Sequence, residues 1–156
     1  MPGEELRALM RRFPSGVAVV TVDLEGERIG LTVSSLVSLS LDPPLVGVAV
    51  SRHAALHELL RRAGAFGVSL LGEGQEDVAT RFSRGVPPIA LWTGVETREG
   101  RLGPPLLEGS LGWLECETRA EHPVGDHTLF VGEVVSVEPG APIRPLVHLE
   151  GGFVAV

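Results

Sequence analysis

Three consecutive residues, Ser51, Arg52 and His53, follow an apolar run at 45–50 and precede a segment with helical spacing. A strand-to-helix turn gathers unpaired backbone N–H groups and the positive end of the helix dipole, so it attracts anions. The Ser51 hydroxyl and the Arg52 guanidinium add donors that suit a phosphate. The same residues also fit a helix N-cap beside a solvated arginine. The residues by themselves support the two interpretations about equally.

A second candidate is the sequence Gly125-Asp126-His127, which lies where two predicted strands meet. A histidine held beside a carboxylate on a sharp turn can orient a substrate, donate a hydrogen bond or titrate near neutral pH. Turn chemistry alone also explains Gly-Asp at a hairpin, with an incidental histidine. Taken by itself, this segment favours the plain hairpin.

The sequence Arg81-Phe82-Ser83 closes a predicted helix. A cation in the last helical turn complements the helix dipole without any ligand. An aromatic residue at this position fits a hydrophobic core. These residues alone are therefore a weak indication of a binding site.

The residues from 29 to 41 alternate between apolar and hydroxyl side chains, which is typical of extended chain with one buried and one polar face. The apolar residues are Ile29, Leu31, Val33, Val37, Leu39 and Leu41, and the hydroxyl residues are Thr32, Ser34, Ser38 and Ser40. The two exceptions, Ser35 and Leu36, are adjacent, which predicts a bulge or kink between them. No charge occurs in the stretch. We interpret it as a wall that offers hydroxyls and backbone N–H groups to a polar, planar or anionic ligand.

Other chemistries have little support. His53 and His57 have the i,i+4 spacing of metal ligands, but no third ligand is near them in the sequence, so no metal site is predicted. Cys116 lies in an alternating strand without a motif that supplies a base, and we expect it to be a packing residue. The phosphate-binding motif GxxxxGK[ST] and a GxGxxG motif after a strand are both absent from the sequence.

The composition limits the class of protein. The chain has 156 residues, a formal net charge of −7 and 44% hydrophobic residues, which predicts one soluble globular domain spanning residues 1–156. The acidic balance disfavours nucleic acid and anionic membranes as partners, and no apolar run is long enough to span a membrane. A single cysteine fits a reducing cytoplasm. All thirteen cationic residues are arginines, so any cationic contact to a ligand must come from arginine.

Hydrophobic periodicity predicts the elements that must position these residues. Helical spacing occurs at 4–13, 54–63 and 75–82, and strand patterns occur at 17–22, 45–50, 66–71, 111–121, 128–137 and around 146–156. Residues 83–110 are rich in Gly and Pro and predict a long irregular excursion. Regular βαβ alternation is missing. The sequence therefore favours a mainly β fold, a closed or split antiparallel barrel with a few helices.

Together the motifs resemble one family, the short-chain flavin reductases of the FMN-binding split barrel group. The matching segments run in order through the chain: Phe13-Pro14-Ser15-Gly16-Val17-Ala18-Val19-Val20-Thr21, Gly30-Leu31-Thr32-Val33-Ser34-Ser35, Ser38-Leu39-Ser40, Pro43-Pro44-Leu45, Ala79-Thr80-Arg81-Phe82, Trp113-Leu114-Glu115-Cys116, Gly125-Asp126-His127-Thr128 and Gly132-Glu133-Val134. The resemblance covers nearly the whole chain. It implies an antiparallel, Greek-key-like split barrel that forms a homodimer.

The resemblance also implies an activity, an NAD(P)H:flavin oxidoreductase that transfers a hydride from reduced nicotinamide to FMN or FAD. Such an enzyme often supplies reduced flavin to a separate flavin-dependent monooxygenase. The residues it implies for flavin binding are Thr32, Val33, Ser34, Ser35, Ser38, Ser51, Arg52, Arg81 and Phe82, with His127 contacting the nicotinamide or the flavin.

Two alternatives remain open at this point. One is a flavoprotein that holds FMN tightly as an electron carrier or sensor and turns over little NAD(P)H. The other is a different oxidase on the same barrel, such as a relative of pyridoxamine-phosphate oxidase, although the sequence offers no arginine cluster for a substrate phosphate.

Overall fold

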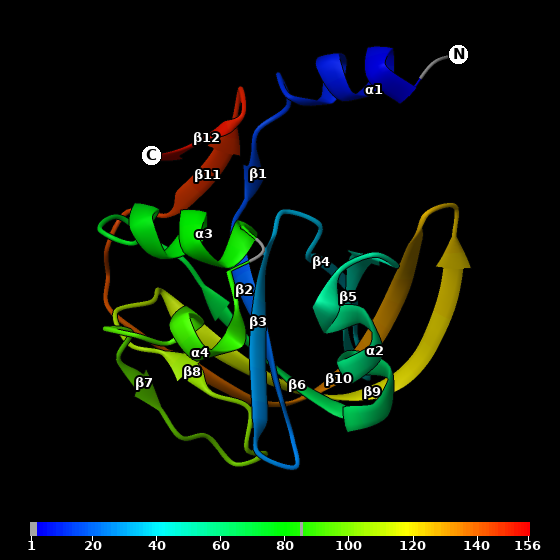
Figure 1. Cartoon of the computed structure of the whole chain (residues 1–156), viewed down its shortest axis with the longest axis vertical. Helices are drawn as coiled ribbons and strands as arrows, with labels where there is room; N and C mark the ends of the chain where they lie inside the picture. Colours follow the sequence, from blue (N-terminus) through cyan, green and yellow to red (C-terminus); the bar gives the residue numbers. More distant parts are fainter. Residues whose placement is uncertain (1–2, 85) are drawn as a thin grey trace.

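The computed structural model describes residues 3–84 and 86–156 (Figure 1). This part of the chain contains four helices and twelve strands, many of them short. The helices are α1 (Gly3–Met10), α2 (Ala55–Ala63), α3 (Glu76–Ser83) and α4 (Pro88–Leu91). The strands are β1 (Ser15–Gly16), β2 (Ala18–Leu24), β3 (Glu27–Val33), β4 (Val37–Leu41), β5 (Pro44–Ser51), β6 (Ala65–Leu70), β7 (Thr97–Arg98), β8 (Leu106–Leu107), β9 (Gly112–Val124), β10 (His127–Pro139), β11 (Leu146–Leu149) and β12 (Gly152–Ala155).

Seven strands form one antiparallel sheet in the order β3-β2-β6-β9-β10-β5-β4. Strand β5 pairs with β10 and not with β6, which is the next strand along the chain. This pairing gives the expected Greek-key-like connection. The sheet curls strongly but stays open, with β3 at one edge and β4 at the other. The prediction of a mainly β, antiparallel fold with few helices is confirmed, in the split form of the barrel. Smaller sheets, β1-β11-β12 and β7-β8, lie beside it.

The stretch from 29 to 41 differs from the prediction in two ways. The predicted irregularity at Ser35 and Leu36 is present, but it is a break between two strands and not a bulge within one, because residues 34–36 link β3 to β4. The apolar side chains of β4 are also not in the core: Val37 is 44% exposed and Leu41 is 87% exposed. Alternation indicates that one face of a strand is apolar, but it does not indicate whether the same chain covers that face.

The Ser35 side chain holds the linker 34–36 against β5. Its hydroxyl donates a hydrogen bond to the carbonyl oxygen of Ala49 (2.8 Å) and accepts one from the Ala49 N–H (3.1 Å). The linker 34–36 is therefore fixed to β5 two residues before that strand ends at Ser51.

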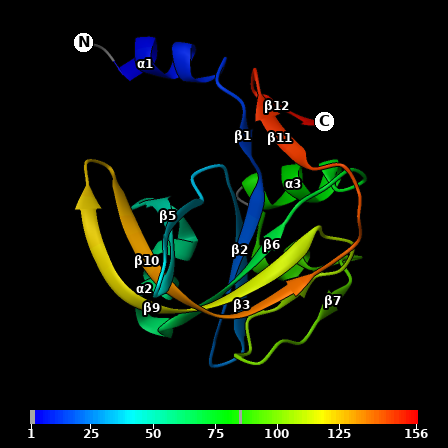
Figure 2. The same cartoon turned by 180° about the vertical axis from the view of Figure 1, so that it is seen from behind.

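Strands β9 and β10 form a long hairpin that bends around the back of the molecule (Figure 2). The sequence predicted one strand that ends at 121 and another that begins at 128, but both continue to the turn, which consists of Gly125 and Asp126. Gly125 has φ +59°, a left-handed conformation that glycine adopts without strain. The register between the two strands shifts twice, near Gly132 and near Val135. Such shifts increase the bend of a hairpin.

Helices α2 and α3 confirm the expected helical segments. Helix α2 buries Leu56, Leu59 and Leu60 and ends at Gly64, whose φ of 74° forms a left-handed C-cap. Helix α3 buries Ala79 and Phe82. After α3, which ends at Ser83, the described residues of the predicted excursion up to 110 are irregular apart from α4, β7 and β8.

Helix α1 begins as predicted but is shorter, and it stands clear of the body of the molecule (Figure 1). It has no buried residue. Its apolar positions are all at least half exposed: Leu6 55%, Leu9 63%, Met10 50%, and Phe13 just after the helix 65%. The helical periodicity was therefore correct, but its apolar face does not pack on its own chain.

Cys116 is fully buried between β6 and β10. Burial raises the pKa of its thiol to about 12, with a smaller contribution from the nearby charge of Glu115. Since the thiolate is the reactive form, we expect no measurable labelling by a thiol reagent at neutral pH in the native protein. The same reagent should label one thiol per chain after unfolding in guanidinium. Rapid labelling of the native protein would contradict this packing role.

Candidate functional site

The turn that follows β5 carries the residues expected to bind an anion. Ser51 is half-buried, and its hydroxyl oxygen accepts a hydrogen bond from the His53 N–H (3.2 Å). Within the part of the chain that the structure describes, its own proton has no acceptor and can be donated to a ligand. Arg52 is exposed, and among the described residues its guanidinium has no ion-pair partner. The N-cap residue of α2, Ala54, makes no side-chain cap bond. The first N–H groups of α2 are therefore not capped by a side chain.

The turn between β9 and β10 lies directly against this one. His127 faces Ser51 in the pairing of β10 with β5, and the Arg52 N–H donates to the carbonyl oxygen of Asp126 (3.0 Å). The Nδ1 of His127 lies 2.7 Å from Oδ1 of Asp126. An ionised carboxylate can only accept, so Nδ1–H is the donor and Nε2 remains available to a ligand. We call the group Ser51, Arg52, Asp126 and His127 the strand-end cluster.

The pKa of Asp126 lies below its usual value. The main cause is the hydrogen bond from His127, followed by the charge of that ring and, further down, the charge of Arg52. In His127→Ala we expect the Asp126 pKa to move back up, as followed by NMR titration of the carboxyl carbon. Because a lowered carboxyl pKa stabilises the fold only above its unfolded pKa, any such contribution is lost as the pH falls through the folded value. An unchanged Asp126 titration in His127→Ala would contradict the hydrogen bond.

The linker 34–36 approaches the same ends of the strands, because Ser35 is bonded to Ala49. Within the described residues, no hydrogen bond is found from the backbone N–H groups of Ser34, Ser35 or Leu36. These groups lie outside both flanking strands and are available to a ligand. The linker therefore adds backbone donors beside the strand-end cluster.

The structure places the other predicted hydroxyls differently. The Thr32 hydroxyl donates to the carbonyl oxygen of Ala79 in α3 (2.7 Å), so it ties β3 to that helix. Val33 is buried in the core, whereas Ser34 and Ser38 are exposed. Ser34 also lines a hollow under α1 with Arg11 and His148. The hydroxyl protons of Thr32 and Ser35 are thus already donated within the protein, and a place for these residues in a ligand site remains a prediction.

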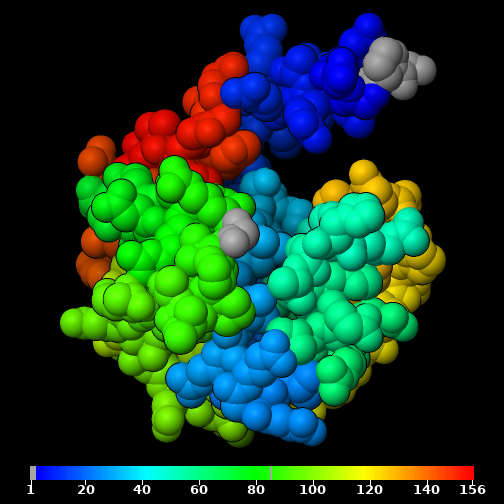
Figure 3. Space-filling view, in the orientation of Figure 1, coloured from blue at the N-terminus to red at the C-terminus, as the bar shows by residue number. Residues whose placement is uncertain are grey.

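A groove of about 390 Å³ opens beside the Ser51–His53 turn, between α2 and the end of α3 (Figure 3). Its floor is β3, including Gly30 and Leu31. Its walls are the start of α2, with His53, and the segment after α3, with Arg84. Arg84 is a cation that the sequence motifs did not single out. The sequence feature that could have indicated Arg84 is its position directly after the end of a predicted helix.

Of the sequence Arg81-Phe82-Ser83 predicted to close the helix, Phe82 and Ser83 line this groove and Arg81 does not. Phe82 is 1% exposed and packs edge-to-face on Trp92, with ring centroids 5.1 Å apart. It also lies against Gly30, where an added Cβ would meet the ring at 2.9 Å. The Arg81 guanidinium instead donates to the carbonyl oxygen of Thr93, on a neighbouring hollow. Phe82 is thus a core residue that also lines the groove, and Arg81 links α3 to the segment after α4.

His127 does not point into the groove. Thr128 contacts α2 through His57, and successive residues of a strand face opposite sides, so His127 faces away from α2. Ser51 pairs with His127, and His53, two residues further on, lines the groove. The turn 51–53 therefore lies between the groove and His127.

Comparison with known proteins decides the family. The family model described as flavin reductase like domain matches residues 10–156. The chain belongs to the flavin reductase like family. Among its relatives, the reductase component of 4-hydroxyphenylacetate 3-monooxygenase from Thermus thermophilus is 43% identical, over 96% of this chain and 94% of the relative. An NADH-dependent flavin reductase from a Rhodococcus species is 39% identical, over 95% and 83%.

Solved structures agree with this family. The NADH:FAD oxidoreductase SgcE6 of Streptomyces globisporus superposes with a TM-score of 0.93 at 35% identity, over 99% of this chain and 93% of that one.

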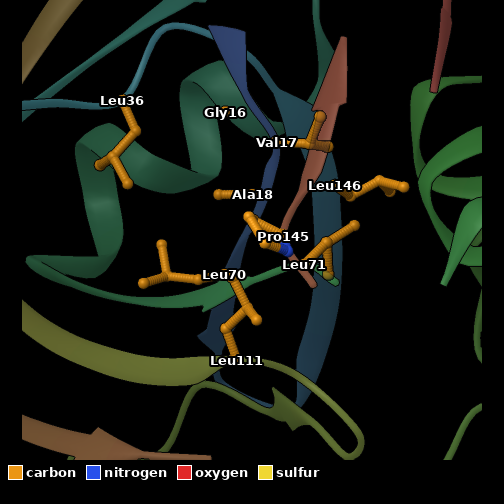
Figure 4. Close-up of a pocket in the computed structure, with 9 residues that line it drawn as sticks. All are labelled: Gly16, Val17, Ala18, Leu36, Leu70, Leu71, Leu111, Pro145 and Leu146. Carbon is orange, nitrogen blue, oxygen red and sulfur yellow. The ribbon is translucent and has the colours of Figure 1, made fainter. Parts of the chain in front are cut away.

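A second cavity in this flavin reductase like domain has a different character. It has a volume of about 160 Å³ and lies near the junction of β1 and β2 (Figure 4). It is lined by glycine, proline and aliphatic residues only: Gly16, Val17, Ala18, Leu36, Leu70, Leu71, Leu111, Pro145 and Leu146. Because no lining side chain is charged or carries a hydroxyl, these side chains provide no donors for a phosphate. The groove and the strand-end cluster are therefore the better candidates for binding an anionic cofactor.

The histidines at 53 and 57 do not form a pair. His53 is exposed at the groove, whereas His57 is buried and contacts Thr128. Over residues 3–84 and 86–156, no three His, Cys, Asp or Glu side chains gather closely enough to hold a metal ion. In the same residues, no helix is long and apolar enough to cross a membrane.

Proposed function

We propose that this protein is an NAD(P)H:flavin oxidoreductase that reduces FMN or FAD and passes the reduced flavin to a separate monooxygenase. One observation carries the proposal. The Ser51–Arg52 turn, the free N–H groups of the linker 34–36 and the Asp126–His127 pair all lie at one end of β5 and β10. The names of the relatives, among them an NADH-dependent flavin reductase and a monooxygenase reductase component, support the activity and the kind of partner.

The residues present fit a flavin phosphate. Within the described residues, the Arg52 guanidinium has no ion-pair partner and the Ser51 hydroxyl proton has no acceptor, and the start of α2, which no side chain caps, adds backbone donors. The adjoining groove of about 390 Å³ falls within the range of small-molecule sites. We infer that Arg52 and Ser51 hold the phosphate and that the linker 34–36 donates to the polar edge of the ring.

Bound flavin supplies the acceptor for a hydride from reduced nicotinamide, and this is the demanding chemistry of the reaction. The protein binds and orients. Backbone donors at the linker 34–36 favour the negative charge that the ring gains on reduction. His127, with Nδ1 held by Asp126, presents Nε2 to the nicotinamide nucleotide. No side chain needs to remove or supply a proton in the hydride transfer itself.

The direct test follows NADH and NADPH oxidation by the purified protein, with and without added FMN or FAD. We expect oxidation that depends on added flavin and continues through many flavin molecules per enzyme. A yellow protein with stoichiometric FMN and negligible turnover would instead identify an electron carrier or sensor. A protein that binds no flavin would reject both functions.

We also propose that the protein is a homodimer and works in the cytoplasm, where its single cysteine stays reduced. Helix α1 exposes Leu9 and Phe13, and the edge strand β4 exposes Leu39 and Leu41. Apolar groups gathered in this way on a surface mark contact sites between proteins.

The dimer gives a prediction for α1. The double variant Leu9→Asp with Phe13→Asp should elute as a monomer in size-exclusion chromatography with light scattering, while the parent elutes as a dimer. The free energy needed to bury two carboxylates in an apolar contact exceeds the free energy that the contact contributes. A suitable control is Ile89→Asp, because Ile89 is 92% exposed on α4 and lies outside both apolar surfaces. A monomeric parent protein would contradict the dimer.

A further inference from the structure

A buried polar pair behind the strand-end cluster has no part in the function described so far. The Nε2 of His57 lies 2.8 Å from the hydroxyl oxygen of Thr128. His57 is 9% exposed and Thr128 is 6% exposed. The pair joins the first turn of α2 to the start of β10.

His57 is an unusual residue for its position. The buried face of α2 otherwise consists of Leu56, Leu59 and Leu60. The His57 ring also packs edge-to-face on Phe130, with centroids 5.5 Å apart. A leucine would satisfy this packing without burying polar nitrogens, which is costly unless they are hydrogen-bonded. The imidazole therefore has a use that packing alone does not explain.

The geometry of the strand connects this pair to the site. Thr128 directly follows His127, and the two side chains point to opposite faces of β10. A contact that fixes Thr128 also fixes the rotation of the strand about its axis at this point. It therefore sets the direction in which His127 leaves the strand.

The contact also joins the two halves of the cluster. Helix α2 follows the turn that carries Ser51 and Arg52, and β10 begins at His127. The backbone bond from the Arg52 N–H to Asp126 holds the two turns together at the surface. The bond between His57 and Thr128 holds them together again in the interior.

We propose that His57 is a positioning residue, which acts through Thr128 to hold His127 toward the nicotinamide nucleotide. This rests on the proposed function, in which His127 contacts that nucleotide. Asp126 fixes the ring of His127 from the solvent side, and His57 fixes the backbone that carries the ring from the inside.

The test compares two variants that remove the bond by different routes. Thr128→Val replaces the hydroxyl with a methyl of similar size, and His57→Leu matches the leucines around it. We expect both to raise KM for NADH about two- to tenfold, the range for one lost hydrogen bond, with kcat and the Kd for FMN nearly unchanged. Thr128→Ser keeps the hydroxyl and should restore the parent KM.

Ser69→Ala is the matched control. The Ser69 hydroxyl is also buried and accepts from the Leu107 N–H (2.9 Å), but it lies on β6, away from the strand-end cluster. It should lower the Tm without moving KM. If Thr128→Val and His57→Leu behave like Ser69→Ala, the pair is only structural and the proposal is wrong.

A measurement without turnover completes the test. In protein labelled with ¹⁵N-histidine, the parent should show His127 protonated at Nδ1, and Thr128→Val should show a mixture of tautomers. An unchanged His127 signal in that variant would overturn the proposal. Different results would show that the proposed function itself is wrong. The parent protein would then not oxidise NADH with added flavin, or His127→Ala would leave KM for NADH unchanged.

Discussion

Replacing Arg52 with alanine will weaken FMN binding by about ten- to hundredfold and leave riboflavin binding unchanged. Riboflavin has the same ring and ribityl chain but no phosphate, so the pair of ligands isolates the phosphate contact. Arginine is the only cationic residue besides histidine in this chain, and the Arg52 guanidinium has no ion-pair partner among the residues that the structure describes. Hydrogen bonds to charged groups contribute more than neutral ones, and this sets the size of the effect.

The measurement is a fluorescence titration of each flavin at fixed ionic strength, because salt screens the contact. Arg62→Ala is the matched control, since Arg62 is an exposed cation in the last turn of α2, the helix that follows the Arg52 turn. It removes the same charge from the molecule but should leave both affinities unchanged. Equal weakening of FMN and riboflavin by Arg52→Ala would place Arg52 elsewhere than at the phosphate.

Much of the fold could be predicted because its strands and helices bury one face each. The strands at 17–22, 45–50, 66–71, 111–121 and 128–137 and the helices at 54–63 and 75–82 appear in the structure with small shifts at their ends. The failures concern α1 and β4. Their apolar periodicity is real, but the face that it marks lies on the surface of this chain, as with Leu9 and Leu41. Periodicity alone cannot distinguish a face buried in the same chain from one left for another molecule.

The sequence predicted which residues could form the candidate site, but not which other residues each of them contacts. Ser51, Arg52 and His127 come together because β5 and β10 pair over their ends, and two separate motifs in the sequence do not reveal that pairing. The hydroxyls of Thr32 and Ser35 bond to Ala79 and Ala49, which are 47 and 14 residues away. Such long-range bonds depend on how the strands curl. Local spacing carries no information about them.

Gly132, in the core, is another residue whose contacts could not be predicted from local spacing. It lies in β10 at a register shift against β9. An added Cβ would stand 2.6 Å from Cζ of Phe66 and 2.9 Å from Cβ of Cys116. Phe66 is fully buried and packed in the core, so its ring has no free space to move into. The bend of the sheet thus depends on the absence of a side chain at this position.

Gly132→Val should therefore destabilise the protein by about 3 kcal/mol or more, which is roughly 6–12 °C in Tm for a chain of this length. The cost comes from overpacking, because the new side chain must displace the Phe66 ring or flatten the bend. Thermal unfolding followed by circular dichroism measures the shift. Gly16→Val is the control, since Gly16 also lies in a strand but a Cβ there meets nothing within 4 Å. A Tm for Gly132→Val equal to that of Gly16→Val would show that Phe66 does not pack against β10 as the structure has it.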